Sequence, residues 1–225
     1  MDFLSLNAMK SAGWATVLLL SAVAWAASKP HVVAFGKWTT VRVLSGSEET
    51  QAADLKVRAL YVDGKLKEFT FGAPHEITDR LFVVRRVIRV NDALPSDAAP
   101  QWAWLRAGWL AVDRGNGHLS PAALPEFDPD ASAASWYRDY AAYCGISQDA
   151  KQVYAVVVQL GRRKPILRKS LGEATADGSV LCPAPSWQRH PARVTFADKS
   201  GPLTYAVRGA AVVAEDNSDE DEDKN

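Results

Sequence analysis

Apolar and polar residues alternate with a period of two along most of the chain beyond residue 30, and few stretches repeat at helical spacing. Because successive side chains of a strand point to opposite faces of a sheet, this alternation predicts a mainly β protein. The strands expected from it are 31–35, 38–44, 55–62, 65–71, 81–90, 102–112, 140–146, 152–160, 165–169, 193–197, 203–208 and 210–214. We therefore expect antiparallel hairpins, with a meander over residues 140–169.

Two local signals refine this expectation. Asp63-Gly64 predicts a two-residue type I′ turn, because that turn requires positive φ at both central positions. Within 81–90, Arg86 interrupts an apolar face that Phe82 and Val84 begin, which indicates a bulge or an edge position.

The segments 102–112 and 130–138 are assigned from signals other than alternation. The tryptophans of 102–112 fit either a helix or a strand, but Gly108 would cost a helix about 1 kcal/mol, which favours the strand. One short helix is expected near 130–138, since Asp128-Pro129 offers an N-cap followed by proline at the first helical position.

Two stretches resemble each other at a distance in the sequence. Residues 146–157 (ISQDAKQVYAVV) and 196–207 (FADKSGPLTYAV) each place a polar turn before an apolar strand. Such units recur in β-propeller blades, so a small or partial propeller-like arrangement is the alternative to an irregular antiparallel fold.

The two ends of the chain differ from its body. Residues 1–26 combine Lys10, a short apolar run and small residues at Ala24 and Ala26, which predicts a secretory signal peptide cleaved before Ala27. The alternative is an uncleaved anchor, although the apolar run is short for a permanent membrane span. Residues 215–225 contain seven acidic residues and one lysine without any aliphatic or aromatic side chain, so we expect a disordered acidic tail. Residues 27–214 then form one β-rich domain, with 92–100 as the best candidate for an internal boundary.

Charge is distributed unevenly behind a formal total of zero. The body, 27–214, carries 24 basic and 18 acidic residues. Its densest basic cluster predicts an anion-binding surface that consists of Arg162, Arg163, Lys164, Arg168 and Lys169. Anionic envelope lipids or acidic polysaccharides are the partners expected outside the cytoplasm. Nucleic acid is not expected, because no recognition motif accompanies the basic residues.

The chain has two cysteines, Cys144 and Cys182, both beyond the predicted signal peptide. In an oxidising compartment a single pair usually forms a disulfide. A bridge here would close a loop of about 38 residues and stabilise the fold by about 3–4 kcal/mol.

No sequence motif for catalysis, cofactor binding or metal binding is present. The best catalytic candidate is the segment 74–79 (PHEITD), where His75 lies beside carboxylates and could act as a general base. A polar turn between strands explains the same segment. Asp128, Asp130 and Ser132 alternate as calcium ligands do, yet the expected glycine and glutamate are absent, which favours capping. Six tryptophans follow the signal, and exposed indoles among them would stack on sugars, whereas buried ones would pack the core.

The run SWYRDYAAYCG through QLGRRKP (135–165) resembles a group of exported bacterial proteins of unassigned activity. The likeness extends upstream through LKVRALYVDG and HEITDRLFVVRR. It implies export and brings no cofactor or catalytic residue with it.

These observations favour an exported, non-catalytic protein with a binding or structural role in the cell envelope. The alternative is a hydrolase or lyase whose carboxylates meet only in three dimensions. A pocket that holds two or more of His75, Glu76, Asp79, Asp113, Asp139 and Asp149 would favour the enzyme. A flat surface that presents Arg162, Arg163 and Lys164 would favour binding.

Overall fold

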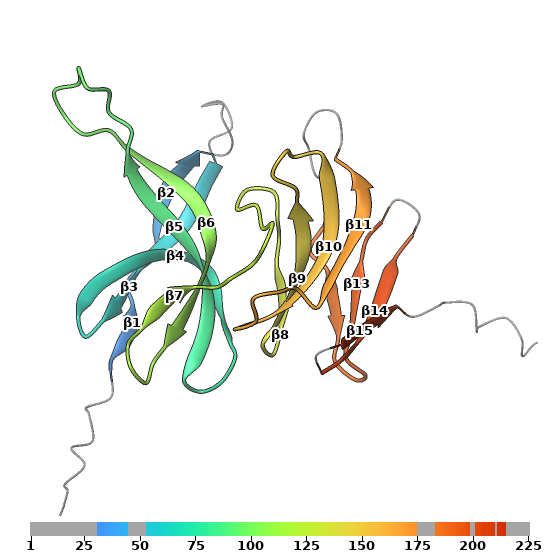
Figure 1. Cartoon of the computed structure of the whole chain (residues 1–225). Helices are drawn as coiled ribbons and strands as arrows, with labels where there is room; N and C mark the ends of the chain where they lie inside the picture. Colours follow the sequence, from blue (N-terminus) through green and yellow to red (C-terminus); the bar gives the residue numbers. More distant parts are fainter. Residues whose placement is uncertain (1–30, 45–52, 175–182, 199–200, 210, 215–225) are drawn as a thin grey trace, which may run out of the picture.

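The computed structural model describes residues 31–44, 53–174, 183–198, 201–209 and 211–214. Every regular element in these ranges is a β-strand, and the strands form three sheets (Figure 1). No helix long and apolar enough to cross a membrane occurs in the described part of the chain. The mainly β, antiparallel fold expected from the alternation is therefore confirmed.

The first sheet closes on itself as a barrel. Its strands are β1 (Val33–Phe35), β2 (Thr39–Leu44), β3 (Ala53–Val62), β4 (Lys65–Glu76), β5 (Leu81–Asn91), β6 (Trp102–Asp113) and β7 (Leu119–Pro121). Strands β2 to β6 pair in sequence, and β2 also pairs with β6, which completes a ring of five. Because five strands that alternate in direction leave the first and fifth running the same way, the β2–β6 pairing is parallel.

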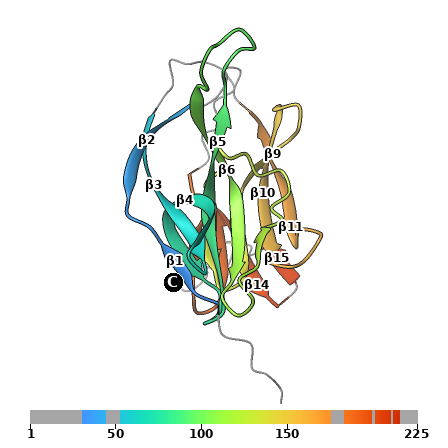
Figure 2. The same ribbon diagram turned by 90° about the vertical axis from the view of Figure 1, so that its left-hand side faces the viewer.

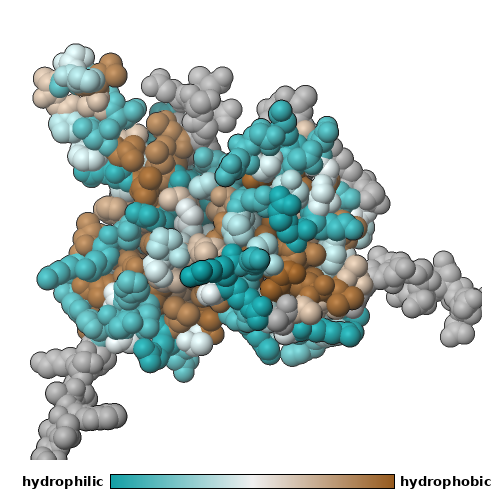
Figure 3. Space-filling view, viewed as in Figure 1, coloured by the Kyte–Doolittle hydropathy of each residue, from teal (hydrophilic) through white to brown (hydrophobic). Residues whose placement is uncertain are grey.

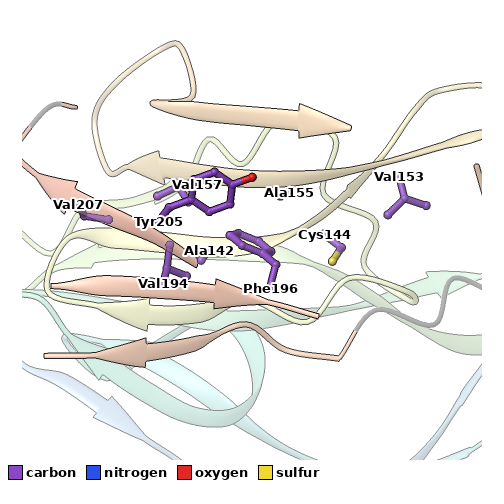
Figure 4. Close-up of a cluster of buried hydrophobic side chains, with 9 residues drawn as sticks. All are labelled: Ala142, Cys144, Val153, Ala155, Val157, Val194, Phe196, Tyr205 and Val207. Carbon is purple, nitrogen blue, oxygen red and sulfur yellow. The ribbon is translucent and has the colours of Figure 1, made fainter. Parts of the chain in front are cut away.

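The other two sheets face each other as a sandwich. One contains β8 (Ser135–Tyr137), β9 (Tyr140–Ile146), β10 (Gln152–Gln159) and β11 (Leu167–Glu173), and the other β12 (Ser186–Gln188), β13 (Arg193–Phe196), β14 (Leu203–Arg208) and β15 (Ala211–Ala214). Phe196, Val157 and Tyr205 belong to the apolar core between the sheets (Figure 4). The two similar stretches, 146–157 and 196–207, therefore belong to the β9–β10 and β13–β14 pairs of facing sheets, not to propeller blades.

The sheet β8–β11 is the middle layer of the molecule, with the barrel on one side and β12–β15 on the other (Figures 1 and 2). On its barrel side, Trp136 of β8 contacts Trp109 of β6, with ring centroids 5.3 Å apart. This position explains the unbroken apolar run 153–158 (VYAVVV), because β10 contributes alternate side chains to cores on both faces. Cys144 lies on the sandwich side, buried next to Phe196 (Figure 4).

Both local signals in the barrel are confirmed. Asp63 and Gly64 have φ of 51° and 74°, and they join β3 to β4 as a hairpin. The β5–β6 register shifts between Arg85 and Val87, so Arg86 does mark a bulge. The strand expected over 102–112 is confirmed as β6.

The helix expected near 130–138 is wrong. The Asp128 carboxylate accepts hydrogen bonds from the backbone N–H groups of Asp130 and Ala131, both at 2.8 Å, and so caps a single turn. The turn does not continue, because the Ser132 hydroxyl donates to the Cys144 carbonyl at 2.6 Å and ties the chain to β9. Residues 135–137 then form β8 and carry Trp136 into the contact with the barrel.

Candidate functional site

A groove opens in the barrel wall where β4 separates from β3. The two strands pair from Val62–Lys65 up to Val57–Phe71, and β4 then bulges before its pairing with β5 resumes at His75. Gly72 begins the bulge with φ of 70°, a conformation that glycine adopts without steric cost. The resulting groove of about 570 Å³, here called the Arg58 groove, is lined by Trp38, Leu55, Lys56, Arg58, Phe71, Gly72, Ala73 and Pro74.

Arg58 is the central charge of this groove. Its guanidinium carbon lies 3.7 Å from the centroid of the Phe35 ring and 4.4 Å from that of Trp38, so two aromatic rings hold the cation. Its Nε atom is buried and has no hydrogen-bond acceptor among the described residues. Burial also lowers the pKa of Arg58, although an arginine remains protonated at neutral pH. The groove thus holds a cation that has lost part of its water and that forms no ion pair with a carboxylate of the described residues.

Trp38 is the second distinctive residue of the Arg58 groove. The indole is 47% exposed, although one neighbour is the Arg58 guanidinium. Large apolar side chains are exposed at few places in the described chain, and Trp102 on the projecting β5–β6 hairpin is the other tryptophan of this kind, at 52% (Figure 1). Trp102 also contacts an arginine, because the guanidinium carbon of Arg89 lies 4.1 Å from its ring. The face shown in Figure 3 mixes hydrophilic and apolar areas on the barrel and on the sandwich alike.

The remaining four tryptophans serve packing. Trp109 and Trp136 meet between the barrel and the middle sheet, and Trp104 packs edge-on against Phe69. Trp187 donates a hydrogen bond from its indole to the Ser135 carbonyl at 3.0 Å, which links β12 to β8.

His75 and Glu76, two of the candidate catalytic residues, are held by structural contacts. His75 stacks on Trp136 and bonds through Nε2 to the Arg138 carbonyl at 2.8 Å. Glu76 accepts two hydrogen bonds from Arg114, at 2.7 and 2.8 Å, which lower the pKa of the carboxyl. Three grooves of the described surface, including the Arg58 groove, are lined by none of the six candidates.

Three other candidate carboxylates also have hydrogen-bond partners. A hydrogen bond from the Gly115 N–H lowers the pKa of Asp113, and one from the Ser147 hydroxyl lowers that of Asp149. Asp139 accepts a hydrogen bond from the Gln159 amide at 2.8 Å. A general acid needs a raised pKa, so the carboxyls whose pKa is lowered do not suit that role.

The basic residues predicted to form one anion-binding surface are distributed over different surroundings. Arg162, Arg163 and Lys164 lie exposed on the turn between β10 and β11. Arg168 instead makes two hydrogen bonds to Glu126, at 2.7 and 2.8 Å, and stacks on Tyr154. Lys169 follows it on β11 and, by the alternation of a strand, points to the opposite face. The three residues of the turn therefore lie together, and an anion-binding surface that includes all five stays a prediction.

The side-chain oxygens of Asp128, Asp130 and Ser132 form hydrogen bonds with other groups of the protein. Besides the turn capped by Asp128, Asp130 accepts a hydrogen bond from Arg106 at 3.1 Å. No group of three or more potential metal ligands occurs within the described ranges.

The predicted disulfide is only half within the described residues. Cys144 is 2% exposed in β9, whereas Cys182 lies outside the described residues. The bridge between them stays a prediction, as do the signal peptide and the acidic tail, whose residues are also outside that part.

Sequence reasoning missed the Arg58 groove. Residues 55–62 alternate as any half-exposed strand does, and nothing in that pattern shows that Arg58 meets Phe35 and Trp38. The strand expected over 65–71 ends where β4 continues through a bulge to Glu76.

Comparison with known proteins adds no relative to this description. No family model matches the chain, and neither a curated protein nor a solved structure matches it.

Proposed function

We propose that this chain is an exported, non-catalytic protein of the cell envelope that binds an anionic ligand in the Arg58 groove. The observation that carries the proposal is the Arg58 guanidinium, held between two aromatic rings with a buried Nε that lacks an acceptor. A ligand anion would compensate this charge, and charge-assisted hydrogen bonds to arginine are among the strong ones.

The enzymatic alternative has less support. The pKa of Glu76, Asp113 and Asp149 is lowered by hydrogen bonds within the protein, and each carboxylate already has a partner. The size of the Arg58 groove, about 570 Å³, is within the range of small-molecule sites. Binding is therefore the role that these residues fit best.

A titration with 8-anilinonaphthalene-1-sulfonate tests the binding site, because this probe combines aromatic rings with one anionic group. We expect the Arg58→Gln and Trp38→Ala variants to weaken probe binding about tenfold. The matched controls are Arg89→Gln and Trp102→Ala, which alter the other exposed tryptophan–arginine pair and should leave the affinity unchanged. Equal effects of both pairs of variants, or none, would refute a site at Arg58.

Export has its own test, which does not depend on the groove. Intact-mass measurement of protein from a cell fraction outside the cytoplasm should show the loss of residues 1–26. Non-reducing peptide mapping of the same sample should link Cys144 to Cys182. Full-length protein in the cytosol with two alkylatable thiols would contradict the proposed localisation.

A further inference from the structure

We infer that the ligand of the Arg58 groove is an amphiphile, an acyl chain that ends in one carboxylate or phosphate, and not an acidic polysaccharide. This inference rests on the proposed function, which places an anion at Arg58, and it names the chemical class. The arguments come from the groove lining, the number of charges and the bulge in β4.

The lining is poor in groups that could bind hydroxyls. Apart from Lys56 and Arg58, the lining residues are Trp38, Leu55, Phe71, Gly72, Ala73 and Pro74. None of these side chains except the indole N–H can form a hydrogen bond. A sugar ring that entered the groove would give up water around several hydroxyls without replacement, and such burial is unfavourable. An acyl chain loses no hydrogen bonds there and gains contact with apolar walls.

The charge of the groove fits a single headgroup. Arg58 is the partly buried cation, and Lys56 on the same strand is exposed at the groove. No acidic residue lines the groove. A planar guanidinium with a flexible ammonium nearby suits one carboxylate or phosphate, whereas a polysaccharide with repeated charges needs a row of cations.

The bulge of β4 forms the wall against which the acyl chain of the ligand would lie. Ala73 and Pro74 lie beyond the last β3–β4 pair, Val57–Phe71, so this wall presents small apolar groups where strand pairing has ended. Trp38 forms the opposite exposed side, and its rigid indole gives a large contact area. The headgroup would bind at Arg58 with the chain between Trp38 and the bulge.

The dependence of affinity on acyl-chain length tests the inference most directly. Burial of one methylene group contributes about 0.8 kcal/mol, so the affinity should rise about fourfold for each CH₂ until the groove is full. We would titrate octanoate, decanoate and laurate by calorimetry below their micellar concentrations, with tri-galacturonate as the acidic oligosaccharide. Arg58→Gln should weaken laurate binding about tenfold, and Arg89→Gln should not change it.

Two further arms keep the outcome clear. Ala73→Asp places a like charge in the wall and should abolish laurate binding in a variant whose circular dichroism matches the wild type; it replaces Arg58→Gln should that variant not fold. Phosphatidylglycerol vesicles, compared with soluble laurate, distinguish a lipid taken from a bilayer from a free fatty acid.

The possible failures are distinct. Binding of tri-galacturonate that depends on Arg58, with no binding of laurate, would overturn the amphiphile and leave the proposed function standing. Laurate affinity that is independent of chain length would also overturn it. Absence of any probe binding that responds to Arg58→Gln would overturn both.

Discussion

The contact between the barrel and the sandwich predicts that the two halves unfold together. Phe196 offers the perturbation, because it is fully buried between the sandwich sheets, remote in the fold from the barrel, with its ring edge-on to Tyr205 at a centroid distance of 6.1 Å. Truncation of such a side chain to alanine costs about 3–5 kcal/mol, the sum of lost transfer energy and a cavity. For a domain of about 190 residues this corresponds to a fall in Tm on the order of 10 °C.

The contacts between the barrel and the middle sheet determine whether the barrel is destabilised together with the sandwich. Val83 and Trp109 of the barrel pack against Trp136 and neighbouring residues of the middle sheet, and Arg85 donates a hydrogen bond to the Pro129 carbonyl at 2.6 Å. We expect these contacts to transmit the full destabilisation of Phe196→Ala to the barrel.

Hydrogen exchange followed by mass spectrometry measures this directly. In Phe196→Ala, the most protected amides of β5 should lose the same free energy of opening as those of β10. The reciprocal variant Phe82→Ala, which truncates a fully buried barrel residue, should affect β10 equally. Barrel amides that keep wild-type protection in Phe196→Ala would refute a single cooperative domain.

Three further predictions concern individual contacts. Gly64→Ala should lower stability by about 1 kcal/mol in urea unfolding, because Gly64 has φ of 74° and no neighbour within 4 Å of an added Cβ, which leaves backbone strain as the cause; an unchanged midpoint would contradict this. Tyr143→Phe should cost about 1–3 kcal/mol in the same assay, since the Tyr143 hydroxyl donates to the Pro125 carbonyl at 2.7 Å and its loss leaves that acceptor unpaired. The Arg114 hydrogen bonds lower the pKa of Glu76 from its ordinary 4.5, so the stabilisation by this pair is complete above that pH and is lost as the pH falls through the folded value; an NMR titration of Arg114→Gln should return the Glu76 pKa to the ordinary range.

The sequence predicts those parts of the fold that depend on near neighbours. The Asp63-Gly64 hairpin and the Arg86 bulge each depend on a few adjacent residues, and both were predicted. Three strands of three residues, β7, β8 and β12, were not, because alternation has no statistical weight over so short a length.

The errors and omissions have a non-local cause. Asp128 has the chemistry of a helix cap, but the hydrogen bond from Ser132 to the Cys144 carbonyl ends the turn, and that partner is remote in sequence. The Arg58 groove likewise depends on contacts with Phe35, on β1, and Trp38, just before β2, and both are more than 15 residues away in sequence. Patterns along one strand do not contain such information.

The parallel closure of the barrel has a kinetic consequence. Among the described residues, the pairs Val43–Trp104 and Leu44–Leu105 join β2 to β6, and they connect segments about 60 residues apart. Because so long a loop must be closed before this parallel pairing forms, the seam should assemble late during folding and be the first to fluctuate open. Water would then reach the barrel interior along one line of the wall, while the antiparallel neighbours stay intact.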